Sequence, residues 1–151
     1  MNLPPSFTQD PQGNLGLQVQ EGACTVLFDA LDGQGDELSA HVGRLRFAHG
    51  WAAEYVALSP TFALPLDQRC TAQAFLYEVA DSPWLAEKIA HRLQQYPAWL
   101  GWDRRTYRHY VVQGHDDCCH LVATGFELDL VPRSREPEGR LPLADDFDDV
   151  H

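Results

Sequence analysis

The chain has 151 residues, of which 44% are hydrophobic and 22% charged, the size and composition of one soluble globular domain. Its net charge of −11 excludes the usual kind of nucleic-acid binder, which needs Lys and Arg to neutralise phosphates. The same charge argues against an anionic membrane surface as a partner. The chain contains no run of eighteen apolar residues, the length needed to span a bilayer. We therefore expect neither a membrane-spanning segment nor binding to a membrane surface.

The N-terminus and the cysteines favour a cytoplasmic location. Residues 1–6 contain no basic segment followed by an apolar run, so we expect no secretory signal. The four cysteines, Cys24, Cys70, Cys118 and Cys119, form no C-x-x-C pair. In a reducing compartment they are expected to be thiols that pack as small hydrophobes.

The first half of the chain predicts strands. Residues 1–16, with three prolines and two glycines, are expected to form a flexible arm. Strands are expected at 17–20 and 24–28, before an acidic turn at 32–36. Residues 37–47 alternate in polarity, and the apolar parity changes at Gly43, which predicts a β-bulge there. Residues 51–58 are predicted as a strand, with a helix as the alternative, and 71–79 as the next strand.

One amphipathic helix is predicted at about residues 83–96. Ser82 is placed as its N-cap, and Pro83 occupies the first helical position, where a missing N–H costs nothing. Leu85, Ile89 and Leu93 follow at intervals of four and form an apolar stripe. Proline at position 97 then ends the helix.

Residues 107–131 predict a long β-hairpin with its turn at 114–117. Together these elements predict an α+β fold, a mostly antiparallel curved sheet of about five to seven strands packed on the one helix. The single domain is expected to span 17–131, followed by a disordered acidic tail at 132–151. The core is predicted to contain Leu27, Phe47, Phe75, Leu85, Ile89, Leu93, Val111, Val122, Phe126 and Leu128.

Three side chains of the hairpin form a candidate set of metal ligands. If residues 114–117 form the loop, Gln113 pairs with Cys118, and then His109, Cys118 and His120 share one face of the strands. Imidazole and thiolate are zinc ligands, so this face is a candidate zinc site. The same Cys and His side chains could also act as nucleophile and base in a thiol-dependent enzyme.

A second candidate site lies just before the hairpin. It combines aromatic rings with guanidinium groups, which can form paired hydrogen bonds to a carboxylate or a phosphate. Its residues are Trp102, Arg104, Arg105, Tyr107 and Arg108. The alternative is that these arginines pair with nearby acids and cover the helix end.

Three functions remain open. The body up to residue 131 carries sixteen acids against eight bases, and the chain lacks the serine-hydrolase, zincin and nucleotide-binding motifs. This favours a small non-catalytic binding module, of the inhibitor or immunity type by analogy, that engages a basic protein. The alternatives are a metal- or thiol-dependent enzyme centred on 107–131 and an anion-binding domain that uses Arg104 to Arg108.

Overall fold

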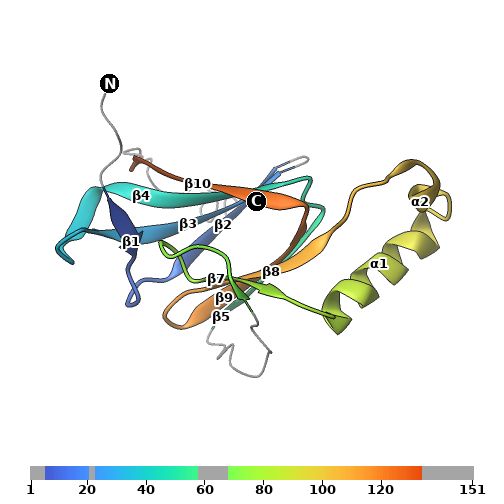
Figure 1. The fold of residues 1–151 in the computed structure, drawn as a ribbon, viewed down its shortest axis with the longest axis horizontal. Coiled ribbons are helices and arrows are strands. Elements are labelled where there is room, and N and C mark those ends of the chain that lie inside the picture. Colours follow the sequence, from blue (N-terminus) through green and yellow to red (C-terminus); the bar gives the residue numbers. More distant parts are fainter. Residues whose placement is uncertain (1–5, 21–22, 58–67, 134–151) are drawn as a thin grey trace, which may run out of the picture.

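The computed structural model describes residues 6–20, 23–57 and 68–133 (Figure 1). Within these ranges the chain forms ten strands and two helices. The elements are β1 (Phe7–Gln9), β2 (Leu15–Gln20), β3 (Ala23–Asp32), β4 (Glu37–Ala48), β5 (Ala52–Ala57), β6 (Gln68–Arg69), β7 (Leu76–Val79), α1 (Pro83–Gln95), α2 (Trp99–Trp102), β8 (Arg108–Gln113), β9 (Asp117–Ala123) and β10 (Gly125–Pro132).

The strands form two five-stranded sheets. The first has the order β1-β3-β4-β10, with β2 also pairing with β3, and the second has the order β5-β9-β8-β7-β6. Every pairing in them is antiparallel. Figure 1 shows the two sheets as stacked layers, with α1 and α2 at one side. The α+β class with mainly antiparallel strands is confirmed, although the described strands outnumber the five to seven expected.

The main core lies between the two sheets. Strand β3 alternates half-buried and buried residues from Ala23 to Ala30, as a strand with one covered face should. The buried side chains that meet between the layers include Phe7, Val26, Phe28, Leu45, Phe47, Leu76, Tyr110, Val112, Cys119 and Leu121. Aromatic rings join the layers, since the Phe47 ring centroid lies 5.5 Å from that of Tyr110.

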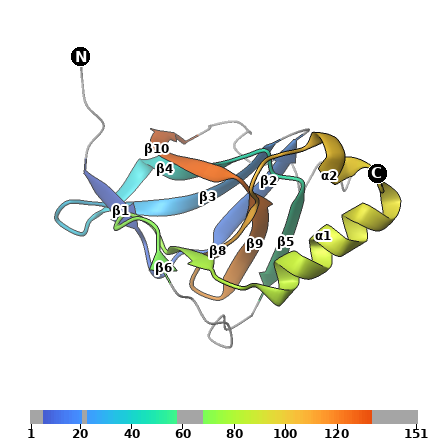
Figure 2. The same ribbon diagram turned by 45° about the vertical axis from the view of Figure 1, so that its right-hand side comes forward.

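Three of the ten predicted core residues, Phe47, Val111 and Val122, are buried. The other seven are half-buried: Leu27, Phe75, Leu85, Ile89, Leu93, Phe126 and Leu128. Leu27 was placed on the wrong face of its strand, because Val26 and Phe28 face the core instead. The helical stripe is only half-covered because α1 packs beside the second sheet and contributes no fully buried residue (Figure 2).

The helix itself forms where the sequence predicts it. It ends at Gln95, one residue short of the predicted boundary. The Ser82 hydroxyl accepts a hydrogen bond from the backbone N–H of Leu85 at 2.9 Å, so the predicted N-cap is confirmed. The segment 51–58 contains strand β5, which excludes the helical alternative.

The predicted hairpin divides between the two sheets. Its register is as expected, with Gln113 opposite Cys118 and Val111 opposite His120. At Thr124, however, the chain leaves the second sheet, and β10 pairs with β4 in the first. The turn is anchored by hydrogen bonds from the Thr124 N–H and hydroxyl to the Ala48 carbonyl, at 3.0 and 3.2 Å.

The bulge predicted at Gly43 lies elsewhere. Gly43 is regularly paired with Phe28 and with Leu130, and the register shift falls between Asp29 and Leu31. Glycine is needed at position 43 for a different reason. A Cβ atom there would overlap the ring of Phe28, which packs directly on the backbone.

Described strands extend past both predicted domain boundaries, 17 and 131. Phe7 and Gln9, inside the expected arm, are buried in β1, and β2 begins at Leu15. Strand β10 continues to Pro132. The tail predicted for 132–151 lies outside the described residues from 134 onward. Within the described ranges, neither helix has the length and apolar character needed to cross a bilayer.

Candidate functional site

The hairpin histidines belong to a chain of contacts that begins at the helix. The Oγ atom of Ser82 lies 2.7 Å from Nδ1 of His109, and Nε2 of His109 lies 2.9 Å from Nδ1 of His120. Nε2 of His120 lies 3.7 Å from the Sγ atom of Cys118. The predicted trio of His109, Cys118 and His120 is therefore brought together, with Ser82 added from the helix N-terminus.

A tryptophan from α1 covers this chain. The Trp84 ring centroid lies 4.4 Å from that of His109 and 5.4 Å from that of His120. Its indole N–H donates to Glu54 Oε1 on β5 at 3.1 Å. The cover leaves His109 only 1% exposed.

Burial decides the charge of the two histidines. Loss of hydration and, secondarily, the neighbouring His120 lower the pKa of His109 to about 4. Burial also lowers the pKa of His120, although the Glu54 carboxylate opposes that shift. Both rings are therefore neutral at pH 7, and a neutral pair can share one N–H···N hydrogen bond.

This geometry ties the start of α1 to the second sheet. The Sγ atom of Cys118 belongs to a residue only 1% exposed, and Ser82 is 8% exposed. The 2.9 Å spacing of the two ring nitrogens is shorter than the roughly 3.4 Å between two nitrogens bound tetrahedrally at about 2.1 Å to one zinc. In the described part of the chain no three His, Cys, Asp or Glu side chains are arranged to hold a metal ion. The zinc site stays a prediction that would require these side chains to move apart.

The arginine cluster is dispersed by ion pairs. Arg105 pairs with Asp103 at 3.3 Å, and Arg108 pairs with Glu78 at 2.9 Å. Arg104 is exposed and forms no ion pair with any described residue. Trp102 is 66% exposed. Two of the three arginines are thus paired with nearby acids, as in the alternative interpretation, and the anion site stays a prediction.

Asp103 organises an aromatic box instead. Its Oδ2 atom accepts from the Tyr107 hydroxyl at 2.6 Å and from the Trp99 indole N–H at 2.7 Å. The Tyr107 hydrogen bond, with further donors from Arg105 and Trp99, lowers the pKa of Asp103 to about 2. The Trp51 ring meets both aromatic partners edge-on, with centroids 5.4 Å from Trp99 and 5.7 Å from Tyr107.

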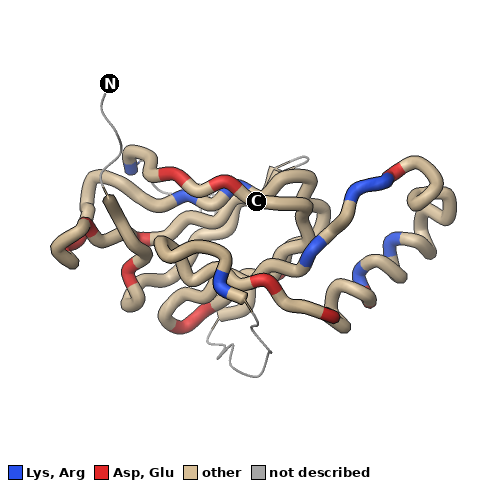
Figure 3. The backbone as a smooth tube through the Cα atoms, viewed as in Figure 1, with Lys and Arg blue, Asp and Glu red and all other residues tan. Residues whose placement is uncertain are grey.

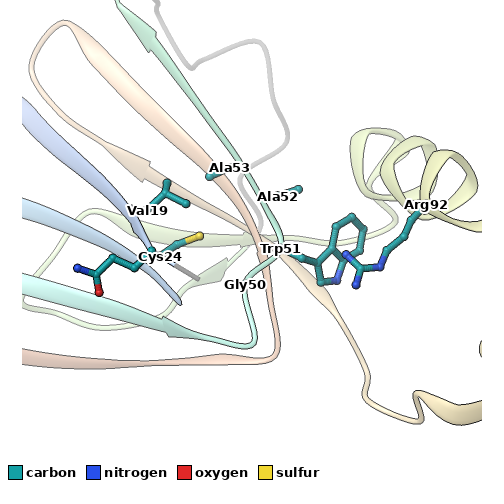
Figure 4. Close-up of a pocket in the computed structure, with 8 residues that line it drawn as sticks. Val19, Cys24, Gly50, Trp51, Ala52, Ala53 and Arg92 are labelled. Atoms are coloured by element: carbon teal, nitrogen blue, oxygen red, sulfur yellow. The ribbon is translucent and has the colours of Figure 1, made fainter. Parts of the chain in front are cut away.

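Beside the box lies a cavity of about 430 Å³, shown in Figure 4. It is lined by Val19, Gln20, Cys24, Gly50, Trp51, Ala52, Ala53 and Arg92. A second cavity of about 200 Å³ shares Trp51, Ala52 and Arg92, and adds Lys88, His91, Gln95 and Tyr96. We call the two cavities together the β5–α1 groove.

Two buried donors at the groove lack acceptors. The Trp51 Nε1 and Arg92 Nε atoms are buried without a hydrogen-bond partner among the described residues. The Arg92 guanidinium carbon lies 4.4 Å from the Trp51 ring centroid and 4.8 Å from that of Trp99. A buried donor without a partner typically costs about 1–3 kcal/mol, so these two atoms call for an explanation.

No family model, curated protein or solved structure matches this chain.

Sequence reasoning missed the groove, although a signal for it was present. Three of the four tryptophans, Trp84, Trp99 and Trp102, lie within or just after the predicted helix, and Arg92 follows Trp84 and Lys88 at intervals of four. Spacing alone assigns Arg92 to the polar side of the helix. The structure shows that this side, rather than only the leucine stripe, turns toward the sheet (Figure 4).

Proposed function

We propose that this protein is a small non-catalytic binding module of the cytoplasm that engages a basic protein through an acidic end, in the manner of inhibitors and immunity-type proteins. The acidic end comprises the exposed or half-exposed carboxylates around β1 and the β3–β4 turn: Asp10, Asp29, Asp32, Asp36 and Glu37. Cys24, Cys70 and Cys119, which form no disulfide, agree with a reducing compartment.

The observation that carries the proposal is the separation of charge along the molecule. Residues 81–108, which contain α1 and α2, hold five bases and three acids. In Figure 3 several basic positions lie at and beside the helices, acidic positions predominate at the opposite end, and further basic positions lie along the upper sheet and in the middle. At that end, one arginine, Arg133, pairs with Asp29 at 3.0 Å. A surface of one sign at one end can steer and orient a partner of the opposite sign.

Asp36 and Glu37 are the carboxylates of the acidic end that are best placed to contact a partner. Asp32 serves its own turn, because its Oδ1 atom accepts from the backbone N–H groups of Gln34 and Asp36. The Asp36 and Glu37 side chains are exposed and form no ion pair in the described part of the chain. Their charges can therefore be removed without disturbing the turn.

The test compares two double variants that each remove two charges. Asp36→Asn with Glu37→Gln changes the acidic end, and Asp81→Asn with Glu87→Gln changes exposed carboxylates near the helix. The parent and both variants are used to capture partners from the cell of origin, and the association rate of the main captured protein is measured by stopped flow. The first variant should associate severalfold more slowly at low ionic strength, and the second should match the parent.

Salt provides a second readout. The parent's association rate should fall steeply as the screening length drops from about 30 Å at 0.01 M salt to about 8 Å at physiological salt, and dissociation should change far less. A captured partner of acidic character, or equal association rates for the two double variants, would contradict the proposal.

A further inference from the structure

We propose that the β5–α1 groove is a binding site for a small organic carboxylate, which accepts hydrogen bonds from Arg92 and from the indole N–H of Trp51. This site is separate from the acidic end, and its chemistry is of the opposite sign.

The first argument is hydrogen-bond satisfaction. Nε of Arg92 and Nε1 of Trp51 are both buried, both lack an acceptor among the described residues, and both residues line the same two cavities. Buried donors in folded proteins nearly always have partners. Figure 4 shows the Arg92 side chain reaching from α1 to the Trp51 indole at the edge of the larger cavity. Both donor-bearing side chains therefore lie at the wall of the larger cavity, and a ligand that displaces the groups covering the two nitrogens would supply the missing acceptors.

The second argument is charge. Arg92 forms no ion pair with any described residue, and Lys88 adds a second cation to the smaller cavity. Neither lining contains an aspartate or a glutamate, although the chain has 22 acidic residues. The carboxylate of the aromatic box, Asp103, is already bonded to Trp99, Tyr107 and Arg105. The groove is therefore suited to an anion that comes from outside the described chain.

The geometry favours a carboxylate. The Nε edge of a guanidinium group presents two parallel N–H donors, which match the two oxygens of a planar carboxylate. The guanidinium carbon of Arg92 lies 4.4 Å from the Trp51 ring centroid and 4.8 Å from that of Trp99, and these cation–π contacts restrict where the guanidinium group can lie.

The walls indicate the rest of the ligand. Val19, Ala52 and Ala53 make one side of the larger cavity apolar, and the Trp51 ring borders it. A volume of about 430 Å³ lies within the usual range for sites of small organic molecules. The ligand class is thus an acid with a compact apolar body, such as an aromatic or short aliphatic monocarboxylate.

The experiment uses the full chain and probes of this class. Phenylacetate, benzoate and hexanoate are titrated into nitrogen-15-labelled protein, and the indole N–H signals of the four tryptophans are followed. Phenylacetamide serves as the neutral match of phenylacetate. We expect one indole signal, assigned to Trp51 by its loss in Trp51→Phe, to shift saturably with at least one carboxylate at a dissociation constant of about 1 mM or tighter. The amide should leave that signal in place.

Variants separate the site from the general charge of the protein. Arg92→Gln should weaken the binding of the carboxylate at least about tenfold, the loss expected for a charge-assisted hydrogen bond. Arg104→Gln removes the same charge from an exposed position outside the groove, and should bind as the parent does. If Arg92→Gln does not fold, Trp51→Phe replaces it, because it removes the indole N–H and keeps a ring against Trp99 and Tyr107. Its binding is then measured by calorimetry, and a similar loss is expected.

Three results would overturn the inference. The first is that no carboxylate probe shifts the Trp51 signal at concentrations far above 1 mM. The second is equal binding by phenylacetate and its amide, or by the parent and Arg92→Gln. The third is saturable occupation of the groove by an acidic peptide of residues 143–151 together with no binding of the small acids, which would make the occupant a protein segment.

Discussion

The buried pair of His109 and His120 should make the stability of the fold depend on pH between 7 and 4. The pKa of His109 is about 4 in the folded protein against an ordinary value of 6.5. Between these values the unfolded chain binds a proton that the folded protein does not bind. Stability is therefore complete above pH 6.5 and is lost as the pH falls toward 4. His120, whose pKa is also lowered by burial, adds a loss of the same sign.

The size of the effect follows from the shift. A group with these two pKa values reduces the free energy of unfolding by about 2 kcal/mol between pH 7 and pH 5, and by about 3 kcal/mol by pH 4. The total stability of a domain is typically about 5–15 kcal/mol, so the change is readily measured. Most carboxylates stay ionised above pH 5, which makes the interval from 7 to 5 the informative one.

Urea unfolding at pH 7, 6 and 5, followed by circular dichroism, measures this dependence in the parent, His109→Gln and His115→Gln. His109→Gln should be less stable than the parent at pH 7 by about 1–3 kcal/mol, because the hydrogen bonds to Ser82 and His120 are disturbed. It should lose less stability than the parent on acidification, since one depressed group is gone. His115, at the exposed hairpin turn, is the matched control and should behave as the parent. A parent whose stability is flat from pH 7 to 5, or a His109→Gln variant as pH-sensitive as the parent, would refute the reasoning.

Two further predictions concern packing. Gly43→Ala should lower the free energy of unfolding by about 1–3 kcal/mol in urea titrations, because the added methyl group overlaps the Phe28 ring. Gly101→Ala is the control. Its methyl group meets no neighbouring atom, so its free energy of unfolding should stay within about 0.5 kcal/mol of the parent. Equal effects of the two alanines would count against the packing of Phe28 on position 43. Ile89→Asp, at a half-buried helix position, should lower the free energy of unfolding by about 1–2 kcal/mol and still melt cooperatively. Val111→Asp buries a charge without a partner and should show no cooperative unfolding transition. An unfolded Ile89→Asp protein would show that the helix stripe contributes more to stability than its exposure implies.

The sequence determined the features that depend on local chemistry. Ser82 and Pro83 are enough to start a helix, because a side-chain oxygen and a fixed φ act within one turn. The turn at 114–117 sets the register of Gln113 with Cys118, and from it the common face of His109, Cys118 and His120. Alternation of polar and apolar residues along the sequence likewise predicts the strands, because successive side chains point to the solvent and to the core.

Only the tertiary structure decided how these elements meet. The chain from β9 into β10 reads as one continuous strand, and its division at Thr124 depends on pairing with β4, more than seventy residues earlier. The contact of Trp84 with His109 depends on which side of α1 the sheet covers. The β5–α1 groove joins Trp51 to Arg92, forty-one residues apart, and no periodicity links them. Patterns in sequence report the environment of single residues, whereas a site of this kind requires long-range contacts that the packing of whole elements creates.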